Sequence, residues 1–421
     1  MKKPRRRPEA YIDGQLLSPE SLMMSYGHEP HLSEGALKLP IFQTSTFAAK
    51  TAEDLESCFE DLHGKKWKGP YQSRGLVYSR FNHPNLETLE ERLTLWDDAE
   101  ACAVFASGMC AISAVCRCFL KPGDLLLHSE PLYGGTDSFL KKELAGIHTL
   151  GFPVKSSLKE IESLLARSRH AKDLAMILME SPSNPTNELG DIAACADIAK
   201  RYSRKGRRII SAVDNTFLGP LWQKPFYHGA DLVIYSATKY IGGHSDLIAG
   251  AVLGADKLIK QLKGIRKDPA TPFTCWLMMR SLETLKLRMT RQMENARRVA
   301  DFLKSHPKIE RVYYLGLIDD VSQARIYQKQ CLEPGAMISF DIRGGKKNAF
   351  KFLNALKLIK IAVSLGSTES LAEHVASTTH SGIPAAERAR MGISQKMIRL
   401  SVGIENPDDL ILDLKQALKK I

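Results

Sequence analysis

The sequence predicts an α/β protein with a mostly parallel sheet in a large domain, followed by a smaller α+β domain. Short apolar runs alternate with helix-like segments from Leu86 to about Thr290, and apolar strands joined by helical crossovers are typical of a parallel sheet buried on both faces. Charged or small polar residues follow several runs, at the strand ends where open α/β sheets place ligands. The expected strands are Ala101–Phe105, Asp124–His128, Leu174–Glu180, Arg208–Val213 and Leu232–Tyr235.

The 421 residues are enough for more than one domain, and the pattern changes twice along the chain. Residues 1–82 show little periodicity, so we expect a tail and then an arm that has no core of its own and packs against another folded part of the assembly. Residues 83–290 carry the alternating pattern of the large domain. A helical run from Arg291 to His306, then shorter strands and helices, indicate a C-terminal domain of residues 291–421.

The net charge of +12 raises the hypothesis of nucleic-acid binding. However, the first ten residues supply a net +4, and the other Lys and Arg alternate with acids along segments such as Leu86–Asp98. This is typical of a solvated surface, so nucleic-acid binding stays a remote alternative. Met1–Pro8 carries five positive charges and no apolar run follows it, which predicts a disordered basic tail rather than a secretory signal. No run is apolar enough to span a bilayer, so we expect no membrane partner.

The eight cysteines have neither metal-ligand spacing nor the density of a disulfide framework. Cys102, Cys110, Cys116 and Cys118 lie in apolar sequence and are interpreted as small buried residues. The pattern suits a reducing cytosol, so a cytoplasmic location is expected and no metal site is predicted.

Ser236, Thr238 and Lys239 follow the apolar run Leu232–Tyr235 and precede a turn at Gly242-Gly243-His244. This predicts a strand, a loop and a second strand. Two small hydroxyls beside the lysine can donate hydrogen bonds to an anion, which indicates a Schiff-base lysine next to a phosphate site. The alternative is a surface lysine in a polar loop.

Asp214 ends another apolar run, and a carboxylate there is what pyridoxal phosphate (PLP) needs to keep its ring nitrogen protonated. With AVDNTF at 212–217 and SATKYIGGHSD at 236–246, the chain resembles the PLP enzymes of cysteine and methionine metabolism, which include cystathionine γ-synthase, cystathionine γ-lyase and methionine γ-lyase. The resemblance covers Leu39 to the C-terminus. It implies a fold-type I PLP enzyme, with PLP bound to Lys239 and Asp214.

The resemblance also implies further ligands for the cofactor phosphate. Ser107-Gly108-Met109 lies at a predicted helix start, where backbone N–H groups and the helix dipole attract a phosphate, and Ser236 and Thr238 join it. Tyr78 and Arg80 match a tyrosine and an arginine that bind the phosphate of a neighbouring subunit's cofactor; the alternative for Arg80 is an ordinary strand-end arginine. A homodimer or homotetramer with shared active sites is therefore expected. The loop Lys65–Pro70 is longer than is usual in the family.

Four more residues match family positions that face the cofactor ring or the substrate. Tyr133 matches a tyrosine that stacks on the ring and exchanges protons, which makes it catalytic beside Lys239. Asn184 matches the residue that hydrogen-bonds the phenolic oxygen of PLP. Arg399, helped by Ser364, matches the clamp for the substrate α-carboxylate; the alternative is an arginine that snorkels or pairs with Glu405.

Three positions bear on the substrate. Relatives that handle cystathionine commonly carry an arginine where this chain has Ser138 and often a glutamate where it has Val363, so a smaller, less charged γ-substituent is expected. Methionine γ-lyases typically have a cysteine where this chain has Gly135. The resemblance favours a methionine γ-lyase-like enzyme that releases 2-oxobutyrate, ammonia and a thiol, with cystathionine γ-synthase or cystathionine γ-lyase as the alternative.

Overall fold

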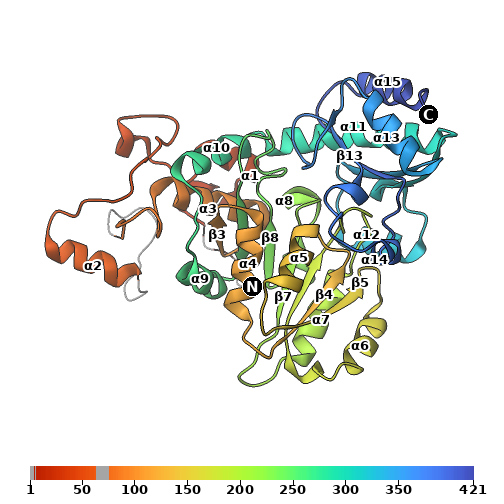
Figure 1. Ribbon diagram of the computed structural model, residues 1–421. Coiled ribbons are helices and arrows are strands. Elements are labelled where there is room, and N and C mark those ends of the chain that lie inside the picture. Colours follow the sequence, from red (N-terminus) through yellow and green to blue (C-terminus); the bar gives the residue numbers. More distant parts are fainter. Residues whose placement is uncertain (1–3, 5, 63–74) are drawn as a thin grey trace. The chain divides into compact units, whose positions relative to one another are not determined.

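Figure 1 shows a computed structural model of the chain, which describes residues 4, 6–62 and 75–421. The predicted long loop Lys65–Pro70 lies outside the described residues. The chain forms two compact units that each combine separate segments: Met1–Cys118, Ser236–Gly242 and Asp246–Thr284 in the first, and Phe119–Tyr235, Gly243–Ser245 and Leu285–Ile421 in the second. The division of the chain at residues 82 and 290 stays a prediction.

The first unit is organised around the helix α3 (Pro84–Asp97) and the antiparallel pair β3 (Ala101–Phe105) and β9 (Gly250–Gly254). His83 caps α3, because its Nδ1 accepts the Leu86 N–H at 3.1 Å. Glu90 is buried on α3 and forms ion pairs with Lys263 and Arg266. Its Oε1 also accepts the Val104 N–H at 2.9 Å, so this carboxylate joins α3, β3 and the helix α9 (Asp256–Ile265).

The predicted disordered tail is wrong at Arg6 and Arg7. Arg6 donates to Thr94 Oγ1 at 2.7 Å, and its side chain is only 4% exposed. Arg7 donates to Glu91 Oε1 at 2.9 Å. Both partners lie on α3, so acidic and hydroxyl groups on that helix hold these two arginines in place.

The other elements of the first unit are short, apart from three helices. They are η1 (Pro8–Ala10), β1 (Tyr11–Ile12), β2 (Gln15–Leu16), α1 (Pro19–Leu22), η2 (Pro30–Ser33), α2 (Ala52–Leu62), α4 (Gly108–Phe119), whose last residue belongs to the second unit, and α10 (Pro272–Leu282).

The second unit contains five parallel strands in the order β8-β7-β6-β4-β5. They are β4 (Leu125–Glu130), β5 (His148–Pro153), β6 (Leu174–Glu180), β7 (Ile210–Asp214) and β8 (Leu232–Tyr235). The sequence missed β5, because this edge strand is mostly half-exposed and has no continuous apolar run. Glu180 pairs with Asp214, and Asp214 with Ile234, so these carboxyl ends lie at one level.

Helices α6 (Leu158–Ala166) and α7 (Ile192–Tyr202) cover one face of these strands (Figure 1). The core between them is aliphatic, with buried side chains such as Leu127 and Ile177 from the strands and Leu165 and Ile198 from the helices. Burying aliphatic side chains in this way is the main favourable term in folding. The expected α/β fold with parallel strands is confirmed.

The same unit contains a second sheet in the order β10-β11-β14-β13-β12, which is antiparallel except for β12 and β13. Its strands are β10 (Ile309–Tyr313), β11 (Met337–Ile342), β12 (Lys360–Ile361), β13 (Leu371–Glu373) and β14 (Met397–Ser401). Helix α11 (Leu285–Ser305) packs on this sheet and starts six residues before the predicted Arg291. Helix α13 (Gly345–Ala355) contacts β11, and helix α15 (Pro407–Leu418) packs against α11 and α13.

The remaining elements of the second unit are α5 (Gly134–Lys142), η3 (Ala171–Asp173), α8 (Gly219–Trp222), η4 (Pro225–His228), η5 (Leu315–Leu317), α12 (Val321–Gln330), η6 (Val375–Ser377) and α14 (Ala385–Arg390). None of the helices in the part of the chain that the structure describes has the length and apolar character needed to cross a membrane.

Candidate active site

The predicted site residues fall into two groups, one in each unit. The first unit contains Tyr78, Arg80, Ser107, Gly108, Met109, Ser236, Thr238 and Lys239, and the second contains Tyr133, Asn184, Asp214, Ser364 and Arg399. The first group corresponds to the predicted phosphate and lysine site, and the second to the predicted ring and substrate site.

The start of α4 packs closely against Ser236. A Cβ added to Gly108 would lie 2.9 Å from both Cβ and Oγ of Ser236, a distance that real Cβ atoms do not tolerate. Ser107 caps the same turn, since its Oγ accepts the Cys110 N–H at 3.0 Å. A helix start without a Cβ, facing a hydroxyl, fits a phosphate group.

Lys239 lies half-buried in a turn that begins at Ser236, because its N–H donates to the Ser236 carbonyl at 3.0 Å. Thr238 differs from the expectation in one respect. Its Oγ1 donates to the Ala249 carbonyl at 3.1 Å and accepts the Ala249 N–H at 3.0 Å. In this conformation the Thr238 hydroxyl ties the lysine loop to the segment before β9.

Tyr78 and Arg80 lie on the surface of the first unit. Tyr78 is 42% exposed, and the exposed Arg80 guanidinium lies 4.7 Å from the centre of the Phe81 ring, which suits a cation–π contact. Arg266 fixes this segment by donating to the Phe81 carbonyl at 3.0 Å. The loop therefore presents an aromatic hydroxyl and a cation outward.

Asp214 and Glu180 are paired residues at the ends of β7 and β6. Asp214 Oδ1 accepts the Thr216 N–H at 3.0 Å and the Thr216 hydroxyl at 2.6 Å. Burial raises the pKa of Asp214. Burial, and then the charge of Asp214, raise the pKa of Glu180 to about 8. A cation beside this pair is electrostatically favoured, and the protonated ring nitrogen of PLP is such a cation, so these residues fit the cofactor.

Arg399 is buried in β14 and already has an anionic neighbour. Its Nη2 forms an ion pair with Glu373 and donates to the Ser364 carbonyl at 2.9 Å, while its Nη1 donates to Asn184 Oδ1 at 3.0 Å. An arginine has five N–H donors, so Nε–H and one Nη1–H are not used by these three contacts. Glu405 is not the partner that the alternative supposed, because it accepts hydrogen bonds from Ser370.

Ser364 and Asn184 both accept hydrogen bonds from Arg399. Ser364 has φ +87°, a strained value for a residue with a Cβ, and strain of this kind gathers at ligand sites. The contact with Arg399 uses the Ser364 carbonyl rather than its hydroxyl. Because Asn184 Oδ1 accepts from Arg399, the Nδ2 donors of this buried amide face elsewhere, as an oxygen acceptor on a ligand would require.

Tyr133 is 41% exposed at the start of α5. A Cβ on the following Gly134 would lie 2.1 Å from the Thr379 carbonyl oxygen, so a glycine is needed where this loop meets residues 378–380. Ser138 is half-buried on α5. Val363 is 53% exposed and lines an apolar pocket of about 360 Å³ with neighbours that include Ile361 and Phe350.

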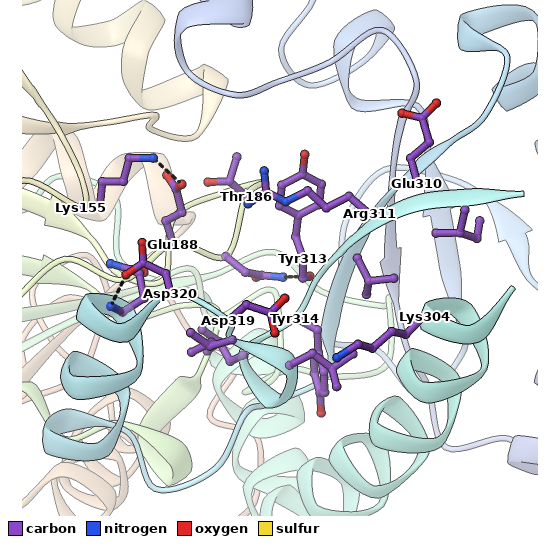
Figure 2. A pocket seen from close by; sticks show the side chains of 17 residues that line it. Lys155, Thr186, Glu188, Lys304, Glu310, Arg311, Tyr313, Tyr314, Asp319 and Asp320 are labelled. Carbon is purple, nitrogen blue, oxygen red and sulfur yellow. Dashed lines mark hydrogen bonds and ion pairs between the residues drawn. The ribbon is translucent and has the colours of Figure 1, made fainter. Parts of the chain in front are cut away.

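A second pocket, of about 310 Å³, lies beside β10 (Figure 2). Lys155 and Glu188 form an ion pair at 3.3 Å on one side of this pocket. Arg311 on β10 and Asp319 also line it. Neither the predicted site residues nor the substrate-specificity positions Gly135, Ser138 and Val363 line this pocket. The candidate site therefore does not include it.

The cysteines follow the expectation only in part. Cys102 and Cys116 are buried, whereas Cys110 and Cys118 are partly exposed, and all eight cysteines of the chain are free thiols. Among the residues that the structure describes, no cluster of His, Cys, Asp or Glu has the arrangement of a metal site.

Sequence reasoning missed the two buried glutamates of the second group. Glu180 ends the apolar strand LAMILME, as Asp214 ends ISAVD, and that parallel could have identified it. Glu373 ends the short strand LAE, and its pairing with Arg399 depends on the neighbouring positions of β13 and β14, which no local pattern reveals.

Residues 20–419 match the model of one protein family, described as Cys/Met metabolism PLP-dependent enzyme. The L-methionine γ-lyase of Pseudomonas putida is 39% identical over 400 residues, which cover 94% of this chain and 95% of that protein. The cystathionine γ-lyase of Rattus norvegicus is 37% identical over 399 residues, which cover 93% of each protein. The resemblance inferred from the sequence motifs is confirmed over nearly the whole chain.

Solved structures are similar over the same length. The cystathionine γ-lyase from Lactobacillus plantarum, complexed with L-serine, has a TM-score of 0.84 and 32% identity, and the match covers 96% of this chain and 99% of that chain. The metB protein from Corynebacterium glutamicum has a TM-score of 0.82 and 32% identity, with 96% and 98% covered. The expected kind of PLP-enzyme fold is confirmed by these neighbours.

The packing of Gly108 on Ser236 predicts that Gly108→Ala weakens binding of PLP by about tenfold or more, because the added methyl group pushes the helix start away from the phosphate. The dissociation constant can be measured by adding PLP to cofactor-free protein and following absorbance. Gly264→Ala is the matched control, since a Cβ there meets nothing within 4 Å. Equal affinities for both variants would show that the start of α4 does not bind the phosphate.

The contacts of Arg399 predict that Arg399→Lys raises KM for an amino-acid substrate roughly tenfold or more and changes kcat less, because a lysine keeps the charge but loses the planar fork. Steady-state kinetics measure both values. The exposed Arg343→Lys serves as control. An unchanged KM in a folded Arg399→Lys variant would contradict a role in binding the α-carboxylate.

Proposed function

Because the chain belongs to the family of PLP-dependent enzymes of cysteine and methionine metabolism, we propose that it eliminates the γ-substituent of sulfur-containing amino acids, with methionine as a preferred substrate. One water molecule is consumed, and the products are 2-oxobutyrate, ammonia and a thiol. Cystathionine γ-synthase or cystathionine γ-lyase activity is the alternative, since relatives with the second name are nearly as similar.

The observation that carries the choice of methionine is the lining of the pocket at Val363. Its walls are mainly apolar, with Phe350, Leu353, Ile361 and Ala362 around Val363. Of the described residues that line it, none carries a positive charge at neutral pH, because burial lowers the pKa of His374. A thioether suits such a wall, whereas a distal carboxylate left unpaired there costs several kcal/mol, about 2–7 for a polar group and more for a charge.

The cofactor, when bound, supplies a ring that accepts the electron pair released at Cα. Lys239 holds the cofactor and, once its amine is freed by the substrate, removes the Cα proton and moves a proton at Cβ. Asp214 keeps the proton on the ring nitrogen. Asn184 donates an Nδ2–H to the phenolic oxygen.

The remaining residues act on the substrate. Arg399 binds the α-carboxylate with the donors that Glu373, Ser364 and Asn184 leave available. Tyr133, exposed at the start of α5, gives its proton to the departing sulfur. Ser107, Gly108, Met109 and Ser236 hold the phosphate, while Thr238, whose hydroxyl is engaged with Ala249, keeps the lysine loop in place.

We also propose that the protein is a homodimer or homotetramer with shared sites. Tyr78 and Arg80 are exposed on the first unit, and the N-terminal arm exposes further large apolar side chains, among them Ile12, Leu32 and Leu37. Covering these side chains in an interface would remove apolar area from water, and closed symmetry is the common form of such assemblies. The neighbour's Tyr78 and Arg80 then complete the phosphate site.

One assay tests the proposed function directly. The protein is incubated with methionine, with cystathionine, and with an O-acylhomoserine plus cysteine, and 2-oxobutyrate, thiol and cystathionine are measured. Elimination from methionine supports the proposal. Formation of cystathionine, with no 2-oxobutyrate from methionine, would instead establish the synthase alternative.

Ser138 carries no positive charge, and no described residue that lines the pocket at Val363 carries one, which predicts that kcat/KM for methionine is at least comparable to that for cystathionine. Ser138→Arg should shift the ratio toward cystathionine by roughly tenfold or more, since one charge-assisted contact contributes about 1.5–3 kcal/mol. Ser163→Arg, which adds the same charge at an exposed position of α6, is the control. A strong preference for cystathionine that Ser138→Arg leaves unchanged would mean that another residue recognises the distal carboxylate.

The shared site predicts complementation between two inactive variants. Mixing Arg80→Ala with Lys239→Ala chains should restore part of the activity, because some sites of the hybrid draw an intact arginine and an intact lysine from different chains. Activity is compared with each variant refolded alone. If hybrids are shown to form by mass spectrometry and remain inactive, each site is built from one chain.

A further inference from the structure

Glu180 joins two loops that carry predicted site residues. Its Oε2 accepts the Tyr133 N–H at 2.7 Å, and its Oε1 accepts the Asn184 N–H at 3.0 Å. The side chain is only 6% exposed. Both carboxylate oxygens are therefore used on backbone donors, one from the loop after β4 and one from the loop after β6.

Further contacts extend this arrangement to the rest of the second group. Asn184 Oδ1 accepts from Arg399, so the position of Asn184 helps to set that of the arginine. Glu180 ends β6 and is also tied to β4, because its own N–H donates to Ser129 Oγ at 3.0 Å, and it lies opposite Asp214 in the sheet. The positions of Tyr133 and Asn184 thus depend directly on the buried Glu180 carboxylate, and that of Arg399 depends on it through Asn184.

We propose that Glu180 is a positioning residue of the reaction: it fixes Tyr133 and Asn184 relative to Asp214, so that proton donor, amide and ring-nitrogen partner keep one geometry. The proposal rests on the proposed function of those three residues. Glu180 accepts hydrogen bonds from the backbone of Tyr133 and Asn184 and needs no contact with substrate or cofactor.

The charges around Glu180 support this role. A carboxylate is the group that can accept on both oxygens, whereas a protonated acid gives up part of that capacity. Burial and then the charge of Asp214 raise the pKa of Glu180, whereas the N–H donors of Tyr133 and Asn184 and the charge of Arg399 act in the opposite direction. A ring cation held by Asp214 would remove part of the repulsion, so a bound cofactor would strengthen the hold of Glu180 on both loops.

Glu180→Gln separates positioning from general stability, because the amide has the same shape but presents its NH₂ to one of the two backbone N–H donors. One loop then loses its anchor. The matched control is Asp413→Asn, since Asp413 is also buried and its two oxygens accept the N–H groups of Lys357, Leu358 and Ile359 at 2.9 Å. No predicted site residue depends on Asp413.

The experiment compares both variants with the parent protein, all loaded with PLP, by thermal unfolding, by visible circular dichroism of the bound cofactor and by kcat on the best substrate found. We expect both variants to lose thermal stability. Only Glu180→Gln should change the cofactor dichroism and lower kcat about tenfold or more. A Glu180→Gln variant with the parent's dichroism and kcat would overturn the proposal, as would an equal loss in Asp413→Asn.

Glu180→Asp provides a second test if the glutamine variant does not fold. It keeps the charge but is one methylene shorter, so it reaches one loop and not both, and we expect the same changes in dichroism and kcat. A folded Glu180→Asp variant that matches the parent in both would overturn the proposal. Failure of the proposed function is distinguishable, because a parent protein inactive on methionine would still bind PLP and show the dichroism on which the comparison depends.

Discussion

Two carboxylates side by side at the ends of parallel strands are the constraint on which the rest of the site depends. Glu180 and Asp214 face each other across β6 and β7, and burial raises the pKa of both. Such a pair persists when hydrogen bonds and a nearby cation offset the repulsion. Backbone donors serve Glu180 and Thr216 serves Asp214, and in the proposed site the ring nitrogen of PLP would provide the cation.

In the second sheet a buried charge is balanced by another side chain of the protein. Arg399 is buried, and Glu373 on the adjacent strand supplies its counter-charge. Removing one partner of a buried ion pair typically destabilises a protein by about 3–5 kcal/mol. The folded protein therefore needs both Arg399 and Glu373. Asn184 links both arrangements, because its N–H bonds Glu180 and its Oδ1 bonds Arg399. In the proposed function, the residues that bind the substrate and those that hold the cofactor ring therefore share one polar network.

The sequence predicted what local pattern determines. Ala101–Phe105, Leu174–Glu180 and Leu232–Tyr235 are strands with the expected limits, because each is a continuous apolar run between polar residues. The half-exposed edge strand β5 lacks that signal. The partner of Arg399 and the docking of Arg6 on α3 depend on tertiary contacts between residues 26 and 88 positions apart, which no single-sequence pattern encodes. The motif residues could be named from the family resemblance, but not the glutamates that hold them.

We propose that Lys239 holds PLP and that Asp214 keeps the proton on the ring nitrogen. The most direct measurement is reduction of the purified, PLP-loaded protein with borohydride, which fixes the cofactor to the lysine that holds it, followed by proteolysis and mass spectrometry. We expect the visible absorbance to disappear and the phosphopyridoxyl mass to be found on the peptide containing Lys239. The same mass on a different lysine, or a protein that takes up no PLP, would contradict the role of Lys239.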